Sequence, residues 1–345
     1  GFYEALDFTR QRIPETGDVA IVRAYMAHHQ GMTLVSLANV LLDSALRRRF
    51  HREPLIRASG ILLQETRHRD ASIALPRADQ EEAALIDDGR LAFEERLHSP
   101  HLPRPSTQLM SNGRYAVMVT AAGAGYSQWR DVGVTRWRED PTCDNHGSFI
   151  YLRDTSDGRV WSAGYQPVCV EPASYDVAFH EDRVRILRQD GNIETMLEVI
   201  ISAEDDAEIR RLTLRNFGTR TSEIEITSYA EITLTPPAAD LAHPAFSNLF
   251  IRSEFAPQVS GLIFSRRPRA ATDRELFGAH VIASDGAAGI EFETDRARFL
   301  GRGRTVQAPI AVTEGRPLTN FTGAVLDPIA SLRVRVKIAS GATAQ

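Results

Sequence analysis

The residues best suited to chemistry lie between Tyr115 and Val168. This segment holds all three tryptophans of the chain, Trp129, Trp137 and Trp161, among alternating arginines and aspartates. Aromatic rings can stack on the faces of sugar rings, and guanidinium or carboxylate groups can form paired hydrogen bonds with hydroxyl groups. The composition of the segment therefore indicates a carbohydrate-binding surface.

Most of these polar and aromatic side chains fall between Tyr126 and His146, which we predict to be a long loop inserted in a hairpin framework. The simpler alternative is that the charged residues of this loop only hold it in place through ion pairs. The residues that would do so are Arg130, Asp131, Arg138 and Asp140.

Short strands are predicted on both sides of this loop. Tyr115 to Thr120 alternates apolar and small residues, and the runs 149–152 and 160–162 are separated by Asp157-Gly158, a strong hairpin turn signal. Further along, apolar and charged residues alternate, and Gly, Asn or Asp turns separate the runs. This pattern predicts antiparallel strands with one solvated face, hence a sandwich. The runs are 183–188, 193–201, 208–216, 222–234, 289–293 and 332–338.

The first 110 residues have a different pattern of apolar and polar residues from this strand-rich part. Apolar residues from Val19 to Leu42 recur at helical spacing, so we expect one or two buried helices with Asp18 as the N-cap. Residues 51–110 contain short amphipathic stretches and a proline-rich run and are predicted to be a connector. The predicted divisions are therefore 1–50, 51–110 and 111–345.

Composition excludes several classes of function. The chain has 345 residues and a formal net charge of −5, without a long run of like charge, so nucleic-acid binding is not expected. Two cysteines, Cys143 and Cys169, form no disulfide framework or zinc motif, and we expect neither a metal nor a cofactor. No apolar run reaches the roughly 20 residues that cross a bilayer. Because the chain begins with Gly1, we expect it to be part of a longer protein.

A family resemblance adds to this interpretation. The run GAGYSQWRDVGVTRWRED, followed by GSFIYLRD and WSAGYQPV, resembles the N-terminal β-sandwich of the inverting disaccharide phosphorylases, a group that includes cellobiose and chitobiose phosphorylases. The likeness continues through 214–218, 226–231 and 243–246. It implies a mainly β fold, an antiparallel β-supersandwich of the galactose mutarotase type. It also implies that loop residues of the sandwich contribute to a sugar-binding mouth, with Gln128, Trp129, Arg130, Asp131, Arg136 and Asp140 as the candidates.

The N-terminal run 1–9, together with 25–32, is similar to the closing helices of the glycoamylase-like (α/α) barrel in cyclic β-1,2-glucan synthases. In that family this barrel precedes a phosphorylase-like module. The resemblance implies that Glu4 is a candidate acid/base residue. The alternative is an ordinary acidic residue at a helix end, because a glycosidase needs two positioned carboxyl groups and the second would lie upstream.

The two resemblances together predict a fragment of a cyclic β-1,2-glucan synthase-like protein. They imply a parent enzyme that transfers glucosyl units to inorganic phosphate with inversion, its catalytic (α/α) barrel lying outside this chain, so that the fragment alone is inactive. A β-glucan oligosaccharide, that barrel and a second copy in a homodimer are the expected partners. The cytoplasmic face, with the parent anchored in a bacterial inner membrane, is the expected location. The alternatives are a non-catalytic carbohydrate-binding module and a scaffold or dimerisation domain.

Overall fold

The computed structural model describes residues 5–8, 19–23, 26–54, 56, 94–102, 105–139, 144–268, 273–284 and 289–345. The chain divides into two compact units, Gly1–Asp87 and Asp88–Gln345. Three residues of the sequence-based predictions, Glu4, Asp18 and Asp140, lie outside the described ranges.

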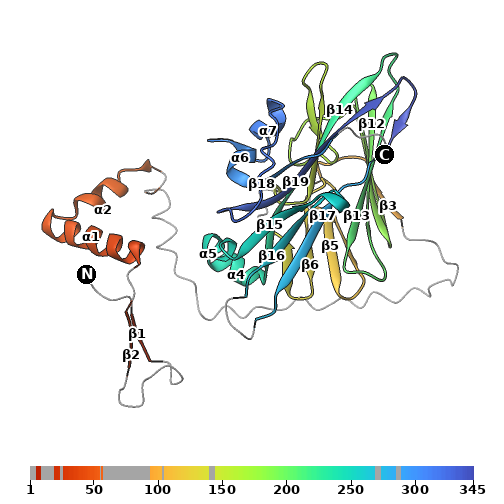
Figure 1. Ribbon diagram of the computed structural model, residues 1–345. Coiled ribbons are helices and arrows are strands. Elements are labelled where there is room, and N and C mark those ends of the chain that lie inside the picture. The colour runs from red at the N-terminus through yellow and green to blue at the C-terminus, as the bar shows by residue number, and fades with distance from the viewer. Residues whose placement is uncertain are drawn as a thin grey trace, which may run out of the picture. The chain divides into compact units, whose positions relative to one another are not determined.

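The described part of the first unit is a two-stranded ribbon followed by two helices. Strands β1 (Ala5–Asp7) and β2 (Ala20–Val22) pair antiparallel, and helices α1 (Ala27–Leu41) and α2 (Ala45–Phe50) follow (Figure 1). The prediction that residues 19–22 begin a helix is wrong, because β-branched Ile21 and Val22 pair with β1 instead. None of the residues of α1 is buried in this chain, contrary to the expectation of a buried helix.

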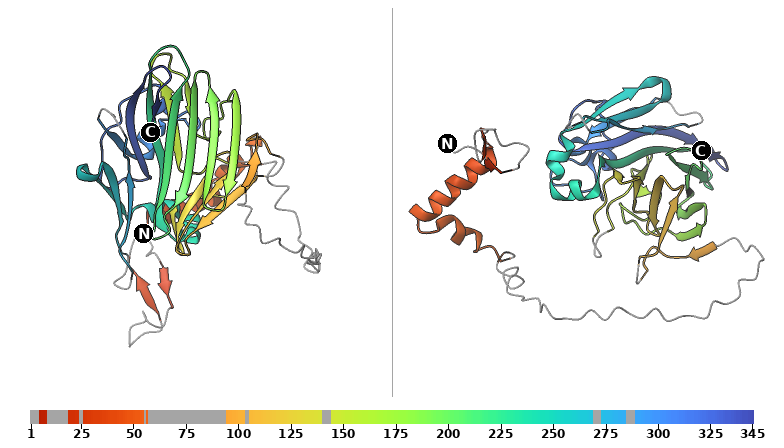
Figure 2. Two further views of the ribbon diagram at one scale, coloured as in Figure 1. Left: turned by 90° about the vertical axis from the view of Figure 1, so that its right-hand side faces the viewer. Right: turned by 90° about the horizontal axis from the view of Figure 1, so that it is seen from below.

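One layer of the second unit is a six-stranded antiparallel sheet, which faces the viewer in the left view of Figure 2. Its strand order is β20-β13-β12-β11-β10-β3, so that the hairpins from β10 to β13 are neighbours in space as well as in sequence. The bounds are β3 (Glu94–Leu97), β10 (Ser174–His180), β11 (Arg183–Asp190), β12 (Ile193–Ile201), β13 (Glu208–Asn216) and β20 (Thr343–Ala344).

The second layer is a nine-stranded sheet built around the long strand β14 (Ser222–Thr235). Along its main path the order is β18-β19-β14-β7-β6-β5-β4, and β8 pairs with both β14 and β9. Strand β3 and all but the last residue of β4 lie in the range 51–110, which the sequence predicts to be a connector. The remaining bounds are β4 (Thr107–Ser111), β5 (Tyr115–Thr120), β6 (Gly125–Trp129), β7 (Val132–Thr135), β8 (Phe149–Asp154), β9 (Val160–Ser162), β18 (Glu291–Asp295) and β19 (Pro328–Ile338).

A small third sheet and four short helices complete the unit. Strands β15 (Ile251–Ala256), β16 (Gly261–Arg266) and β17 (Leu276–Val281) form an antiparallel three-stranded sheet. Two of the helices follow β14, and the other two lie between β18 and β19. They are α4 (Pro237–Ala242), α5 (Pro244–Asn248), α6 (Arg296–Leu300) and α7 (Ile310–Thr313).

Apolar side chains from both large sheets form the main core. Val117 and Val119 of β5 pack with Phe179 of β10 and Ile186 of β11, and all four are at most 1% exposed. The two faces of β14 pack against different parts of the unit, because successive residues of a strand point to opposite sides of the sheet. Tyr229 packs in a cluster with Phe299 of α6, whereas Ala230 packs against the third sheet. The fold is therefore a mainly β antiparallel supersandwich, as the sequence predicts.

The predicted long loop between Tyr126 and His146 is wrong in its first half, which forms the β6–β7 hairpin. Trp129 pairs with Val132 across a two-residue turn. The turn places Arg130 in the left-handed region with φ 53°, a conformation usually given to Gly or Asn, so the sequence carries no turn signal there. Among the described helices, none is long and apolar enough to cross a membrane.

Candidate functional site

The turn between β6 and β7 presents Trp129, Arg130 and Asp131 at one end of the sandwich. The left-handed backbone of Arg130 turns its side chain back over β6, and its guanidinium carbon lies 4.8 Å from the centre of the Trp129 ring. The side-chain amide of Gln128 donates a 2.6 Å hydrogen bond to the carbonyl oxygen of Arg130, which fixes the turn. Three of the predicted sugar-contacting side chains are thus held together by the hairpin itself.

Trp129 is half-buried and its orientation is fixed from the far side. The indole Nε1–H donates a 2.6 Å hydrogen bond to the Asp206 carboxylate, which also accepts from Arg114 Nε at 3.0 Å. One part of the ring packs against the main core. Since the polar edge is already paired and the ring cannot rotate freely, the indole offers an apolar surface, covered in this structure by Arg130.

Beside this turn lies a pocket of about 480 Å³. It lies between the β6–β7 turn, the end of β14 with the start of α4, and the segments that leave β16 and enter β17. Figure 1 shows these elements at the same end of the sandwich. The described residues that line it are Trp129, Arg130, Asp131, Val132, Thr235, Pro236, Ala239, Arg266, Arg267, Pro268, Asp273, Arg274 and Leu276.

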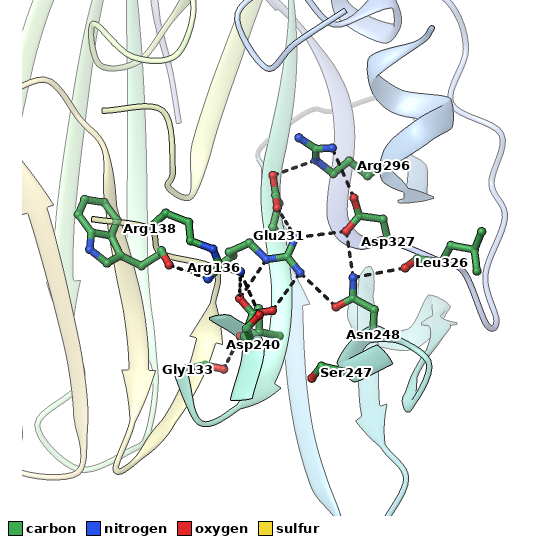
Figure 3. Close-up of polar contacts among 12 residues, drawn as sticks. Gly133, Arg136, Arg138, Glu231, Asp240, Ser247, Asn248, Arg296, Leu326 and Asp327 are labelled. Carbon is green, nitrogen blue, oxygen red and sulfur yellow. Dashed lines mark hydrogen bonds and ion pairs between the residues drawn. The ribbon is translucent and has the colours of Figure 1, made fainter. Parts of the chain in front are cut away.

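Arg136, another predicted sugar contact, lies instead in a buried ion-pair network (Figure 3). Its Nη1 donates to Glu231 at 2.7 Å and to Asp327 at 3.2 Å. Its Nη2 donates to Asp240 and Asn248, and its Nε donates to Asp240 at 3.2 Å. These five acceptors match the five N–H groups of a guanidinium, so no donor remains for a hydroxyl group unless one of these bonds is exchanged.

Two further arginines complete the network. Arg296 Nε donates to Glu231 at 2.9 Å, and its Nη1 lies 3.4 Å from Asp327. Arg138 Nη2 lies 2.6 Å from Asp240. Three guanidinium groups therefore face three carboxylates, and the charges balance within the cluster. Pairing opposite charges through hydrogen bonds is how buried charges are normally accommodated.

Ionisation of the network follows from these contacts. Burial opposes the charge of Glu231, but the nearby guanidinium groups of Arg296 and Arg136 outweigh it and hold the pKa of Glu231 below its usual value. Burial lowers the pKa of His146 below its usual value, and the three arginines act in the same direction. The cluster thus connects the segment after β7 with β14, α4 and the approach to β19 through paired charges.

The structure therefore places the predicted sugar-contacting residues in different surroundings. Gln128, Trp129, Arg130 and Asp131 are together on one turn, and the last three line the pocket. Arg136 is not among the pocket residues, while Asp140 and Glu4 lie outside the described ranges.

Sequence reasoning missed the arginines on the other wall, Arg266, Arg267 and Arg274. The run Arg266-Arg267-Pro268-Arg269 was an available signal, since it concentrates three positive charges within four positions.

Comparison with known proteins agrees with this architecture. Residues 93–345 match the family model described as the glycosyl hydrolase 94 supersandwich domain. The chain belongs to this family. Its supersandwich strands, from β3 to β20, all lie within the matched range.

Individual relatives of this glycosyl hydrolase 94 chain align with it over different lengths. It is 39% identical over 344 residues to the cyclic beta-(1,2)-glucan synthase NdvB of Rhizobium meliloti (strain 1021), covering 99% of this chain and 12% of that protein. It is 25% identical over 222 residues to the N,N'-diacetylchitobiose phosphorylase of Vibrio proteolyticus, covering 63% of this chain and 27% of the enzyme. A solabiose phosphorylase of Paenibacillus borealis is 26% identical over 167 residues, 48% of this chain and 21% of that enzyme. The chain thus spans about an eighth to a quarter of these relatives.

Proposed function

We propose that the supersandwich unit binds β-glucan chains at the pocket beside the β6–β7 turn and so serves an inverting glycoside phosphorylase module. The observation that carries the proposal is that Trp129, Arg130 and Asp131 line one pocket of about 480 Å³. That volume lies within the range of small-molecule sites, and an aromatic ring beside polar forks is suited to a pyranose. The name of the relative NdvB supports β-1,2-glucan as the first ligand to test.

The parent protein, in this proposal, carries the reaction in an (α/α) barrel and uses inorganic phosphate as co-substrate. The phosphorylases among the relatives support this reaction class. The barrel, a β-glucan oligosaccharide and a second copy of the protein are the proposed partners. Attachment of the parent to the cytoplasmic face of a bacterial inner membrane is proposed on the same family grounds.

Isothermal titration of the 345-residue chain with linear β-1,2-gluco-oligosaccharides tests the proposal, with cello-oligosaccharides as the linkage control. We expect binding of the β-1,2 series and no release of glucose 1-phosphate. Trp129→Ala should weaken binding about tenfold or more, because even a nucleic-acid base stacked on an aromatic side chain loses roughly 1–3 kcal/mol of binding free energy when that side chain is replaced by alanine, and we expect a loss at the lower end of this range for a sugar ring. The matched control is Phe217→Ala. Phe217 is also an exposed ring capped by an arginine, with the Arg215 guanidinium carbon 4.5 Å from its centre. It lies beyond the opposite end of β14 from the pocket.

The same titration distinguishes carbohydrate binding from the alternative that the unit is a scaffold. One specific observation favours that alternative: Arg130 already covers the Trp129 ring, so a sugar must displace it or bind at its edge. Equal affinity of wild type, Trp129→Ala and Phe217→Ala would contradict binding at this pocket. Absence of binding to either glucan series would support a purely architectural unit.

A further inference from the structure

The pocket beside the β6–β7 turn has a charge opposite to that of the whole chain. The chain carries a formal net charge of −5. Among the described lining residues, four are arginines, Arg130, Arg266, Arg267 and Arg274, and two are aspartates. These come from three separate segments, so folding assembles the positive charge. A concave site with a surplus of one sign of charge concentrates ligands of the opposite sign.

Three of these arginines are available to a ligand. Elsewhere in the sandwich many arginines are matched to carboxylates, as in the Arg136 network. In contrast, no carboxylate of a described residue lies within ion-pair distance of Arg130, Arg267 or Arg274, and all three are exposed. The Arg130 guanidinium rests on Trp129, and that of Arg267 lies 5.8 Å from the centre of the Phe250 ring. Stacking positions a guanidinium without using its N–H groups, which remain free to bind an anion.

The fourth arginine is fixed as part of the wall. Arg266 Nη1 donates to the carbonyl oxygens of Thr233 at 3.3 Å and Ser247 at 3.1 Å. Its Nη2 donates to Ser247 Oγ at 3.2 Å. This half-buried cation therefore joins β16 to the end of β14 and to α5, and it supplies charge to the pocket from a fixed position.

We propose that this pocket binds a sugar bearing a phosphate monoester, with the phosphate among Arg130, Arg267 and Arg274 and the sugar ring against Trp129. The inference rests on the proposed function for the sugar half and adds the charged group. A guanidinium group can donate two parallel hydrogen bonds to two oxygens of one phosphate. A phosphate monoester dianion also carries two negative charges, which balance the surplus of two positive charges among the described lining residues. A neutral glucan would supply no anionic partner to these three exposed guanidinium groups.

Titration of the full chain with glucose 1-phosphate, glucose 6-phosphate, glucose, inorganic phosphate and a linear β-1,2-glucan tests this inference. We expect at least one sugar phosphate to bind tenfold or more tightly than either glucose or inorganic phosphate, and its affinity to fall as salt rises. Arg267→Gln and Arg274→Gln should each weaken it about tenfold. Arg220→Gln, an exposed arginine beyond the opposite end of β14, should leave it unchanged.

The different ligands of this titration distinguish the proposed function from the phosphate inference. If the glucan binds and needs Trp129, but no sugar phosphate binds more tightly than glucose, the proposed function stands and the phosphate inference is overturned. If inorganic phosphate binds as tightly as the sugar phosphates, or Arg220→Gln weakens binding as much as the pocket variants, the ligand is an adventitious ion only. If neither glucan nor sugar phosphate binds, both proposals fail. Circular dichroism of each variant shows whether the fold is retained.

Discussion

Arg136 Nη1 lies 2.7 Å from Glu231 Oε2, and 9% of each side chain is exposed. This pair joins the segment after β7 to the C-terminal half of β14 and lies at the middle of a neutral cluster of three arginines and three carboxylates. Such a cluster is not in itself strong evidence for net stabilisation, because burying the charges costs about as much as their attraction returns. Removing one arginine is a different matter, since three carboxylates then share two guanidinium groups and one negative charge is left uncompensated.

Arg136→Met should therefore lower the free energy of unfolding of the sandwich by about 3–5 kcal/mol, because Glu231 and Asp240 lose a buried counter-charge. Urea denaturation followed by tryptophan fluorescence measures this change. The control Arg183→Gln removes a surface arginine that pairs with its neighbour Asp182, and it should unfold at nearly the wild-type urea concentration. Equal midpoints for wild type and Arg136→Met would show that the cluster is not needed for folding.

Arg188 should not tolerate replacement by lysine. It is fully buried and forms a two-pronged pair with Asp190 at 2.7 and 2.6 Å, while its Nη1 donates to the Gly164 carbonyl oxygen at 2.5 Å. A lysine ammonium cannot reproduce this planar fork. We expect Arg188→Lys to destabilise by about 2–4 kcal/mol. Arg185→Lys is the matched control on the same strand, since its side chain is 40% exposed and 3.6 Å from Glu198. Similar unfolding midpoints for the two variants would contradict the prediction.

His280 should make the stability of the sandwich depend on pH. Its Nε2 lies 2.8 Å from Ser228 Oγ, and burial lowers its pKa from 6.5 to about 4, with Arg210 acting in the same direction and Glu208 against it. Above pH 6.5 the imidazole is neutral in both states and the stability is complete. Between pH 6.5 and 4 the unfolded chain takes up a proton that the folded chain resists, so the free energy of unfolding falls.

His280 as a whole residue is half-buried, so this loss should be about 1–2 kcal/mol, less than the roughly 3 kcal/mol that the full shift would give. The measurement is the difference in unfolding free energy between pH 7 and pH 4.5 for wild type and His280→Asn. The variant should show a smaller difference, whereas His51→Asn, which changes an exposed histidine outside the sandwich, should match wild type. An unchanged pH dependence in His280→Asn would rule out this histidine as a source.

Gly125 should be irreplaceable at the start of β6. Its φ is 151°, and a Cβ atom there would overlap the carbonyl group of Met118, 2.9 Å from the carbonyl carbon. Gly125→Ala should therefore disrupt the β5–β6 pairing and destabilise by about 3 kcal/mol or more. At Gly113, φ is 88° and nothing lies within 4 Å of the added atom, so Gly113→Ala should cost only the backbone strain of about 1 kcal/mol. Thermal unfolding of both variants tests the difference, and equal melting temperatures would contradict it.

The sequence predicted the strands where alternation is strict and the turns contain glycine. The Asp157-Gly158 turn forms as expected, with Gly158 at φ 76°, and β12 and β13 have the predicted bounds. The β6–β7 hairpin was missed because Arg130, and not glycine, occupies its left-handed position. In the N-terminal unit, helical spacing predicted α1, but pairing with β1 removed residues 20–22 from that helix.

Local periodicity and turn chemistry, which the sequence carries by itself, determined the mainly β antiparallel fold and the gathering of Trp129, Arg130 and Asp131 on one segment. Tertiary structure alone decided which charges are used up and which remain available. Arg136 meets Glu231 and Asp327, which lie 95 and 191 residues further along the chain. Arg267 and Arg274 reach the Trp129 pocket from the third sheet. Ion pairing depends on the distance between two charged groups in space. For residues this far apart along the chain, their spacing in the sequence does not determine that distance.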